Sequence, residues 1–479
     1  MTTPRATLRV SRRDFLAASA VAAGMTMPAR PAQPTPAATR PPDFVIFLTD
    51  DQRWDFLSRM GHPVLRTPNI DQLANEGVLF TNAFVTTPIC CASRASILTG
   101  LYARTHGVHD FNTDFAPETF RLSYPAQLRQ AGYHVGTFGK YGVAVSAPPP
   151  EAMGFTPLPP GDHPYFRSWR GQPTHVTRIV TEQAVDFLRN APADRPCCLM
   201  VHFDAPHAHD YALRPYPPEP DLESLYADAD FPDPPLSDCG FFETMPDFLK
   251  NSEGRRRWGT RFACREQYVE NMRDVSRMIA GIDRAVGAIR DALRETGRDD
   301  RAVILFMSDN GAFYGERGLS DKWYAYEPSI RVPMIWRDPA TPTPARGLPV
   351  DATALNIDIS PTLLDRAGLP VPEQVQGRSL VPFLRGVSPA SWRSDWYFEH
   401  LFRHPRIPRS VGARADDRWT YIRWIDFGEP VEELYDRQAD PQQARNLAAD
   451  PAFRDILRQW RERCDVLRAE IPASPRTDY

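Results

Sequence analysis

The chain has 479 residues, which is enough for one large domain and a smaller one. Its 56 basic and 60 acidic residues give a formal net charge of -4, so it lacks the basic footprint of a nucleic-acid binder. Seven cysteines are too few for a disulfide scaffold, and the adjacent pairs Cys90/Cys91 and Cys197/Cys198 lack the CxxC spacing of zinc and redox sites.

The first 40 residues resemble a twin-arginine export signal followed by a spacer. Arg12 and Arg13 precede a short apolar, Ala-rich stretch at residues 15–27, and the chain up to about residue 40 is rich in Pro and Ala. A basic disordered tail would explain the arginines but not the apolar run behind them. We therefore expect export through the bacterial twin-arginine machinery to the periplasm or the medium. No later run approaches the roughly 18 apolar residues of a membrane span, so we expect no stable membrane insertion.

Several apolar segments are predicted to be buried strands that run directly into polar residues. Residues 44–48, 197–201 and 303–307 are continuous apolar runs, as parallel strands covered on both faces tend to be, and a shorter strand is expected near Val135. Ligands of parallel sheets bind beyond the carboxyl ends of the strands, so we expect functional residues there. The residues that follow these four strands include Asp50 and Asp51, His207, Asp309 and Asn310, and Lys140.

Helical patterns alternate with these strands. Over residues 268–293, apolar side chains recur at three- and four-residue steps, and Gly297 supplies a stop. A shorter helix is expected after Thr67, with Pro68 in its first turn. Residues 88–100, PICCASRASILTG, indicate another helix that ends at the final glycine. This alternation predicts an α/β fold with a large, mostly parallel sheet flanked by helices.

The composition changes after about residue 390. Residues 418–424 and 432–435 have the character of strands, and residues 453–467 form an amphipathic helical pattern. We therefore divide the chain into the export segment and two structural units, a main domain at residues 41–390 and a small α+β subdomain at residues 391–479. Residues 144–165 and 206–236, which are dense in Pro and aromatic residues, are predicted to be ordered loops over the functional site.

Two polar pairs at strand ends indicate a metal site. Asp50 with Asp51 and Asp309 with Asn310 would bring three carboxylates and an amide oxygen to one edge of the sheet. Carboxylates so close together repel one another unless a cation neutralises them, and oxygen ligands suit a hard ion such as Ca²⁺ or Mg²⁺. The simpler alternative is that each pair caps the helix that follows it.

The segment PICCASRASILTG resembles the signature of the type I sulfatases of the alkaline phosphatase superfamily. That signature reads Cys-x-(Pro/Ala)-Ser-Arg, followed by Thr-Gly, and its cysteine is oxidised to formylglycine after translation. Alignment on Ser93 and Arg94 places the oxidised cysteine at Cys90 and leaves Cys91 at the variable position, while Ala92 is a mild variation on the usual Pro. The resemblance extends from about residue 42 to the C-terminus, because further segments occur in the family's order: FLTDDQR, GKYG, SDNG, GLSDKWYAYEPSIRVP, GRSLVPFLRG and ELYD…DP…NLA.

The resemblance implies roles for the polar residues at the strand ends. Arg94 and Lys140 would hold oxygens of formylglycine and sulfate, while Lys322 and His207 would face the sulfate and the leaving oxygen. Taken singly, these residues could instead be an ordinary helix-surface arginine, solvated lysines and a loop histidine. One calcium ion, the metal usual in the family, would be bound by Asp50, Asp51, Cys90 in its oxidised form, Asp309 and Asn310.

The implied function is hydrolysis of a sulfate ester of a small molecule or glycan, more plausibly a carbohydrate than a small aryl alcohol. Hydrated formylglycine carries two hydroxyls on one carbon; one attacks sulfur, and the other lets the group collapse to the aldehyde and release sulfate. A formylglycine-generating enzyme is the implied partner in maturation.

One departure from the family motif affects the release of sulfate: family members commonly have Gly-Lys-x-His where this chain has Gly142. Either another residue such as His209 or Tyr141 replaces that histidine, or the step is impaired.

Two other functions are compatible with the same residues. A phosphonate monoester or phosphodiester hydrolase shares the fold, the metal and in some cases the formylglycine. A calcium-dependent glycan-binding protein that has lost turnover is the alternative outside the enzymes, and the missing histidine at Gly142 is the observation that supports it.

Overall fold

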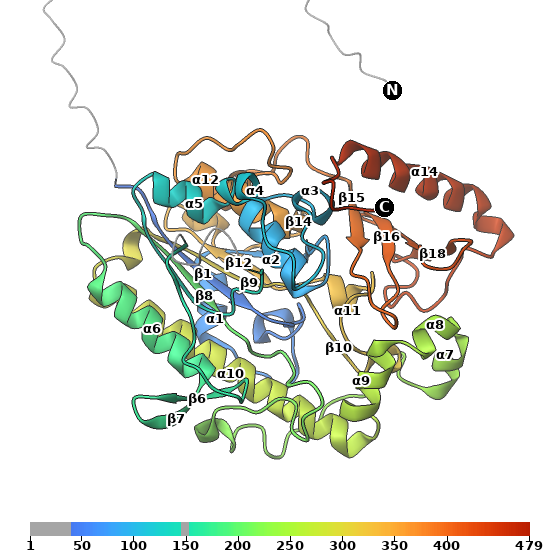
Figure 1. The fold of residues 1–479 in the computed structure, drawn as a ribbon, viewed down its shortest axis with the longest axis horizontal. Coiled ribbons are helices and arrows are strands. Elements are labelled where there is room, and N and C mark those ends of the chain that lie inside the picture. The colour runs from blue at the N-terminus through green and yellow to red at the C-terminus, as the bar shows by residue number, and fades with distance from the viewer. Residues whose placement is uncertain (1–39, 145–152) are drawn as a thin grey trace, which may run out of the picture. The chain divides into compact units, whose positions relative to one another are not determined.

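An eight-stranded sheet forms the centre of the main domain (Figure 1). The computed structural model describes residues 40–144 and 153–479, so the predicted export signal lies outside the described residues. Residues 41–479 form one compact unit. From edge to edge the strands are β13 (Pro349–Val350), β2 (Val78–Phe80), β12 (Met334–Arg337), β9 (Ala302–Ser308), β1 (Asp43–Thr49), β8 (Cys197–His202), β4 (His134–Gly139) and β5 (Phe155–Thr156).

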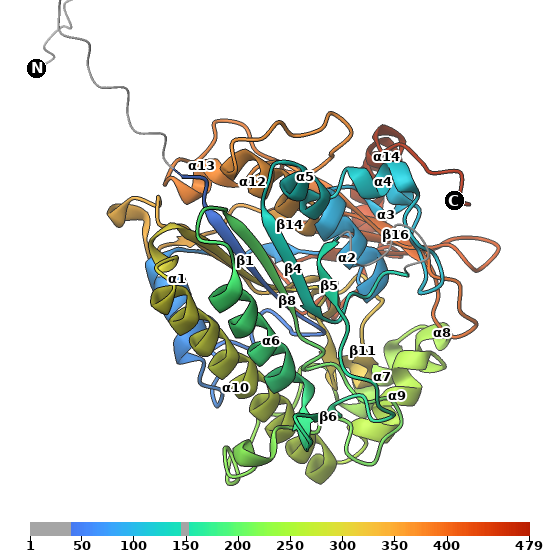
Figure 2. The ribbon, with the colours of Figure 1, turned by 60° about the vertical axis from the view of Figure 1, so that its left-hand side comes forward.

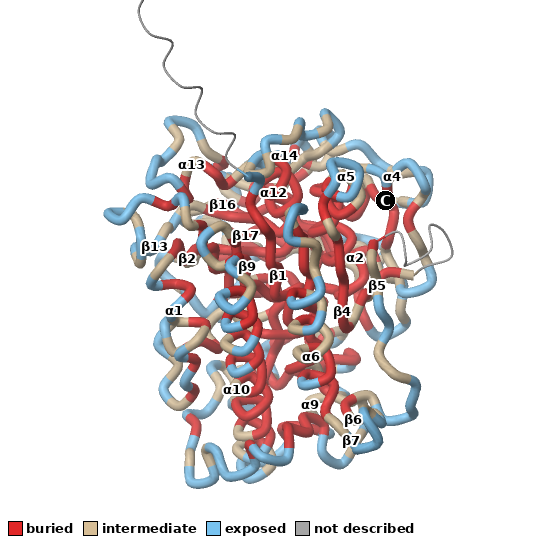
Figure 3. The backbone as a smooth tube through the Cα atoms, turned by 90° about the vertical axis from the view of Figure 1, so that its left-hand side faces the viewer, coloured by how far each residue is buried: buried red, intermediate tan, exposed pale blue. Residues whose placement is uncertain are grey.

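The sheet is mostly parallel, as predicted. β1 pairs in parallel with both β8 and β9, and β4 pairs in parallel with β8 and β5. β12 is the antiparallel member, paired against β9 and β2. Every residue of β1, β8 and β9 is buried, which explains their continuous apolar sequences, and Figure 3 shows this buried centre.

Helices cover both faces of the sheet. On one face, α1 (Pro68–Glu76), α6 (Val176–Asn190) and the 31-residue α10 (Arg265–Glu295) pack together, and Figure 2 shows α6 beside α10. On the other face lie α2 (Cys90–Thr99), α5 (Tyr124–Gln130) and α12 (Ile359–Arg366). The predicted α/β architecture is therefore confirmed. Within the described ranges, no helix has the length and apolar character that a membrane crossing requires.

A second, antiparallel sheet lies near the C-terminus. Its strands follow one another in sequence as β15 (Asp395–His400), β16 (Ser410–Ala415), β17 (Trp419–Trp424) and β18 (Val431–Asp436), and α14 (Arg454–Glu470) packs on it. β17, β18 and α14 match the predicted elements, while β15 and β16 had no predicted counterpart. The small α+β part of the fold is present, and the boundary at residue 390 stays a prediction.

The remaining elements are short. A hairpin of β6 (Phe166–Trp169) and β7 (Gln172–His175) precedes α6 and was not predicted. Residues 206–236 are mainly irregular, as expected. The other elements are β3 (Ala83–Phe84) paired with β14 (Ala354–Leu355), β10 (Phe313–Tyr314) paired with β11 (Ser320–Asp321), and the helices α3 (Ala103–His106), α4 (Pro117–Arg121), α7 (Cys239–Thr244), α8 (Asp247–Lys250), α9 (Glu253–Arg261), α11 (Glu327–Ile330) and α13 (Val381–Leu384).

Strand register explains why distant polar residues converge. Thr49 at the end of β1 lies opposite Ser308 at the end of β9, so Asp50 and Asp309 leave the sheet side by side. His202 at the end of β8 lies opposite Gly139 at the end of β4, which places Lys140 next to the loop that follows β8. All four strands therefore deliver their following residues to one edge of the sheet.

Candidate active site

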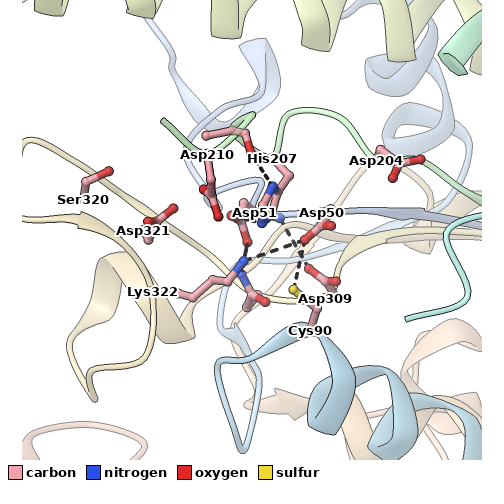
Figure 4. Close-up of polar contacts among 12 residues, drawn as sticks. Asp50, Asp51, Cys90, Asp204, His207, Asp210, Asp309, Ser320, Asp321 and Lys322 are labelled. Atoms are coloured by element: carbon pink, nitrogen blue, oxygen red, sulfur yellow. Dashed lines mark hydrogen bonds and ion pairs between the residues drawn. The ribbon is translucent and has the colours of Figure 1, made fainter. Parts of the chain in front are cut away.

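Cys90 faces the carboxyl ends of the central strands. It is the first residue of α2, a helix buried at every position that ends at Gly100 in the left-handed conformation (φ 74°), as the sequence predicted. In Figure 4 its sulfur points from the helix terminus toward Asp50, while Lys322 and His207 approach from other segments. A helix N-terminus carries partial positive charge and favours an anion, so a sulfate group suits this position.

Asp50 connects Cys90 to two lysines. The Cys90 thiol donates to Asp50 Oδ1 over 3.4 Å. Lys140 Nζ forms an ion pair with Asp50 Oδ2, and Lys322 Nζ lies 4.0 Å from Asp50 Oδ1. Burial opposes ionisation of Asp50, but Lys140, His207 and Lys322 together hold the pKa of its carboxyl well below the usual value. Asp50 is therefore a carboxylate over the working pH range.

Asp51 brings Lys322 and His207 to the same place. Its carboxylate pairs with Lys322 Nζ and lies 3.7 Å from His207 Nε2. Its backbone has φ of 65°, an uncommon conformation for an aspartate, and its carbonyl accepts a 2.9 Å hydrogen bond from the Tyr314 hydroxyl. The buried Tyr314 thus fixes the turn that directs Asp51 into the site.

Asp309 and Asn310 complete the group from β9. Asp309 accepts from the Asp51 backbone N–H at 3.3 Å and pairs with Arg94 Nε at 2.7 Å. Asn310 Nδ2 donates to Asp51 Oδ1 at 2.6 Å. The residues predicted for metal binding and catalysis therefore come together around one point, where one ligand atom each from Asp50, Asp51, Cys90 and His207 lie within 4.8 Å of one another.

The side chains differ in exposure, which indicates how a substrate enters. Asp50 and Asp309 are fully buried, and Arg94, Cys90 and Lys322 are no more than 3% exposed. The Lys140 and His207 side chains are 22% and 25% exposed. A ligand therefore reaches the buried charges from the side of Lys140 and His207.

The unmodified Cys90 is a poor nucleophile in this setting. Burial, reinforced by the charge of Asp50, raises the pKa of its thiol well above the ordinary value, and the thiolate is the reactive form of cysteine. Burial likewise raises the pKa of the neighbouring Cys91 to about 12. All seven cysteines of the chain lie in the described ranges and are free thiols.

The donor set fits a hard divalent cation. Asn310 Oδ1 is buried and accepts no hydrogen bond from any residue of the described ranges, although its amide nitrogen has two acceptors. Three carboxylates stand beside it, balanced by Arg94, Lys140 and Lys322. A bound sulfate ester would add negative charge to this balance, and a divalent ion on oxygen ligands would offset it.

A model of the sulfatase family matches residues 42–369, more than half of the chain. The chain belongs to the sulfatase family. It is therefore a sulfuric ester hydrolase. A second model, described as the C-terminal part of N-sulphoglucosamine sulphohydrolase, matches residues 315–470 of this sulfatase.

Curated relatives align over most of the sulfatase. An N-acetylglucosamine-6-O-sulfatase of Bacteroides thetaiotaomicron is 28% identical over 87% of this chain and 84% of its own length. An arylsulfatase of Clostridium perfringens is 28% identical over 89% and 93%. A multifunctional alkaline phosphatase superfamily protein of Trinickia caryophylli is 25% identical over 88% and 93%.

Solved structures share the fold. A structure in complex with its substrate D-glucosamine-2-N,6-O-disulfate superposes with a TM-score of 0.78 at 25% identity, over 90% of this chain and 98% of that one. The phosphonate monoester hydrolase of Agrobacterium radiobacter superposes with a TM-score of 0.73 at 24% identity, over 90% and 96%. The second likeness concerns the fold alone.

The space beside Gly142 is filled by Arg94. A Cβ atom at Gly142 would lie 2.4 Å from Arg94 Cδ, and the backbone there has φ of 82°. Of the suggested replacements for the family histidine, Tyr141 packs its ring against Phe155 and His209 packs against His163. Neither forms a hydrogen bond with Cys90, Arg94 or Lys140 among the described residues.

His202 is a buried imidazole next to this space that sequence reasoning did not single out. Its Nδ1 lies 3.1 Å from the Lys140 carbonyl, which also accepts a 2.6 Å hydrogen bond from Arg94 Nη1. A carbonyl oxygen only accepts, so Nδ1 carries the proton. Burial and the nearby Arg94 lower the pKa of His202 to about 3, so the ring is neutral at ordinary pH.

Other supporting residues also lacked a local sequence signal. The hydroxyl of the buried Tyr165 donates to the carbonyls of Asp204 (3.0 Å) and His207, and so fixes the loop that carries His207.

The segment of Lys322 is held by two arginines. Asp321, the residue before Lys322, pairs with Arg257 at 2.8 Å and with Arg261 at 2.7 Å. These partners lie far apart in the chain, and only their hydrophobic or charged character is visible in the sequence.

Proposed function

We propose that this sulfatase removes sulfate from a saccharide sulfate ester, with Cys90 oxidised to formylglycine and one calcium ion in the site. The observation that carries the proposal is the position of Cys90, at a helix N-terminus and in contact with a buried cluster of three carboxylates and three cations. The names of the relatives support the substrate class, since one is an N-acetylglucosamine-6-O-sulfatase and one solved structure contains D-glucosamine-2-N,6-O-disulfate.

Calcium would be held by Asp50, Asp51, Asp309 and Asn310 together with the oxidised side chain at position 90. Asn310 Oδ1, which has no hydrogen-bond partner among the described residues, supports this ligand set. When bound, the ion would withdraw charge from a sulfate oxygen and so stabilise the transition state. Formylglycine, as its hydrate, supplies a nucleophilic hydroxyl and a second hydroxyl on the same carbon.

The cations of the chain bind the sulfate group. Lys140 Nζ pairs with Asp50 and Lys322 Nζ pairs with Asp51, so both ammonium groups lie at the same carboxylate pair, where both can bind a sulfate. Arg94 has one buried nitrogen, Nη2, with no acceptor among the described residues. Three fixed positive groups in a site with little water stabilise the charge that develops on the sulfate oxygens.

His207 is the acid for the leaving oxygen. Its Nδ1 lies 2.7 Å from the Ala208 carbonyl, which can only accept, so Nδ1 carries a proton. Its Nε2 faces the Asp51 carboxylate at 3.7 Å. Because the His207 side chain is partly exposed, it can meet the alcohol part of the substrate at the entrance and donate a proton.

A panel of three small substrates tests the reaction class. We expect kcat/KM for 4-nitrophenyl sulfate to exceed the values for bis(4-nitrophenyl) phosphate and phenyl phosphonate esters, measured on enzyme produced with a formylglycine-generating enzyme. A higher value for the phosphodiester or the phosphonate would support the phosphonate monoester or phosphodiester hydrolase instead. The likeness to a phosphonate monoester hydrolase in fold and to a multifunctional relative makes this comparison necessary.

The maturation partners follow from the same proposal. A formylglycine-generating enzyme would act on Cys90 before folding, because the folded chain leaves this residue 1% exposed. The twin-arginine machinery would then carry the folded protein to the periplasm or the medium, guided by Arg12 and Arg13.

A further inference from the structure

A small loop that follows His207 carries an exposed aromatic residue, Tyr211. His209 N–H donates to the Pro215 carbonyl over 2.6 Å and closes the loop of residues 209–215. Within it, Tyr211 has φ of 60°, a left-handed conformation that is uncommon for a non-glycine residue. The residue is 52% exposed. Such a conformation persists where the surrounding structure holds the residue in it.

The Tyr211 ring is anchored rather than free. Its hydroxyl donates to Glu253 Oε1 over 2.5 Å, and the Glu253 side chain is 3% exposed. Glu253 is held in turn by Arg257 at 3.1 Å and by Arg406 at 2.7 Å. The Arg256 guanidinium lies over the ring, 4.9 Å from its centre, and its Nη1 donates to the Tyr211 hydroxyl over 3.3 Å. The hydroxyl end of the ring is therefore fixed on the protein, while half of its surface faces solvent.

A chain of ion pairs connects this ring to the sulfate-binding lysine. Arg257 contacts Asp210, the residue before Tyr211, at 3.0 Å and Asp321, the residue before Lys322, at 2.8 Å. The same guanidinium lies 5.7 Å from the Tyr211 ring and 5.2 Å from the Trp323 ring. Figure 4 shows Asp210 beside His207 and on the same side of the cluster as Lys322. The loop and the sulfate site are thus one connected structure.

We propose that the exposed face of Tyr211 is the platform on which a pyranose ring of the saccharide substrate stacks. A pyranose has an apolar C–H face that packs on an aromatic ring, and hydroxyls at its rim that Arg256 can reach by hydrogen bonds. Tyr211 lies four residues after His207, and the neighbouring Asp210 shares Arg257 with Asp321, the residue before Lys322, so the platform is tied to the segments that carry His207 and Lys322. The inference rests on the proposed function and adds to it a residue that selects saccharides.

Two ligands, N-acetylglucosamine 6-sulfate and inorganic sulfate, distinguish binding of the sugar by Tyr211 from binding of the sulfate group. Tyr211→Ala is expected to raise KM for N-acetylglucosamine 6-sulfate about tenfold, the effect of losing a contact of roughly 1.4 kcal/mol. The inhibition constant of inorganic sulfate, which lacks a sugar, should change less than about twofold. Tyr211→Phe keeps the ring and should retain the wild-type KM within about threefold. Leu213→Ala, a change of a fully exposed residue in the same loop, is the matched control.

Equilibrium binding makes the test independent of turnover. Calorimetry of N-acetylglucosamine 6-sulfate with Cys90→Ala, alone and combined with Tyr211→Ala, should give the same tenfold difference in Kd. An unchanged Kd and KM in Tyr211→Ala, or an equal loss for inorganic sulfate, overturns the platform while leaving the hydrolase intact. Conversely, Tyr211-dependent binding of the sugar without sulfate release by the wild type supports the platform and counts against the proposed reaction.

Discussion

Gly142 limits which side chains can stand beside Arg94. Arg94 Cδ lies where a Cβ atom at position 142 would be, and the backbone has positive φ. The family histidine therefore cannot be restored by a single substitution without displacing the arginine. Because Arg94 also holds Asp309 and the Lys140 carbonyl, its displacement would disturb the predicted metal ligands and the sulfate site together.

We expect Gly142→Ala to lower both the melting temperature and kcat. Its matched control is Gly171→Ala in the turn of the β6–β7 hairpin, where φ is 78° and an added Cβ would meet no atom within 4 Å. Both changes carry the backbone cost of about 1–2 kcal/mol, and only Gly142→Ala adds the clash with Arg94. Thermal unfolding and steady-state kinetics measure the difference. Equal losses in the two variants would show that Arg94 moves aside freely.

The site residues at the strand ends could be predicted from the sequence. The residues that hold them in position could not. Asp50, Asp309 and Lys140 could be identified because each directly follows a buried strand, and the family motif added Cys90. Tyr165 could not, since its contribution is a hydroxyl that meets the carbonyls of Asp204 and His207 only in the folded chain. A side chain whose partner is distant in sequence leaves no local pattern.

Helix α9 acts on the site through two arginines. Arg257 and Arg261 lie one turn apart and both reach Asp321 and Asp210, so this helix joins the segment of Lys322 to the loop after His207. Burial opposes the charge of Asp321, but the two arginines hold the pKa of its carboxyl below the usual value. Lys322 is thereby placed by an element to which it does not belong.

Loss of one of these arginines should destabilise the fold and the site together. Arg261→Met breaks a pair whose side chains are each 2% exposed, and we expect a loss of up to about 3 kcal/mol because the Asp321 carboxylate stays buried. Arg189→Met is the control, because its pair with Glu295 is half exposed and its loss should change the free energy of unfolding little. Urea unfolding and kcat/KM check both values. A wild-type kcat/KM in Arg261→Met would show that α9 does not position Lys322 for catalysis.

The elements themselves were predicted where their periodicity was regular. The pattern at residues 268–293 identified α10, which extends a few residues further at each end. The added residues, 265–267 and 294–295, are polar and therefore lie outside the apolar pattern. β15 was missed because its Glu399 and His400 are polar yet fully buried. β16 was missed because its sequence, SVGARA, is poor in residues that favour strands.

At the scale of the whole molecule, calcium should stabilise the fold by joining the ends of β1 and β9. An ion that binds only the folded state raises the melting temperature by mass action. Asp309→Ala is expected to abolish this increase. Asp338→Ala, which removes a buried carboxylate paired with Arg366, should lower the melting temperature but keep the calcium-dependent increase. An Asp309→Ala protein that keeps the full increase would exclude Asp309 as a ligand.

The calcium-dependent increase in melting temperature should depend on pH. Burial and the charge of Asp50 raise the pKa of Asp309 in the ion-free protein above its unfolded value. A raised pKa means that the folded state holds a proton which the unfolded chain releases, so stability from this group is lost as pH rises toward the raised value. Calcium binds the deprotonated carboxylate of Asp309, so its binding is stronger at the higher pH. Differential scanning fluorimetry should therefore show a larger calcium effect at about pH 8 than at about pH 5.

Export is a property of the whole chain that the first residues should control. Replacement of Arg12 and Arg13 by lysine is expected to leave folded, active enzyme in the cytoplasm, because the twin-arginine pathway carries folded proteins and depends on the arginine pair. Cell fractionation followed by activity assays measures the distribution. Delivery of the double variant to the periplasm at the wild-type level would contradict the predicted signal.

The mass of the peptide that carries residue 90 tests the central claim most directly. Trypsin cleaves after Arg66 and Arg94, so Cys90 and Cys91 lie on one peptide, and fragmentation between them assigns any modification. We predict an aldehyde at position 90 in protein from the native host, and the same aldehyde with most of the activity in Cys91→Ser. An unmodified thiol at position 90 in fully active enzyme, or an aldehyde at position 91, would contradict the account.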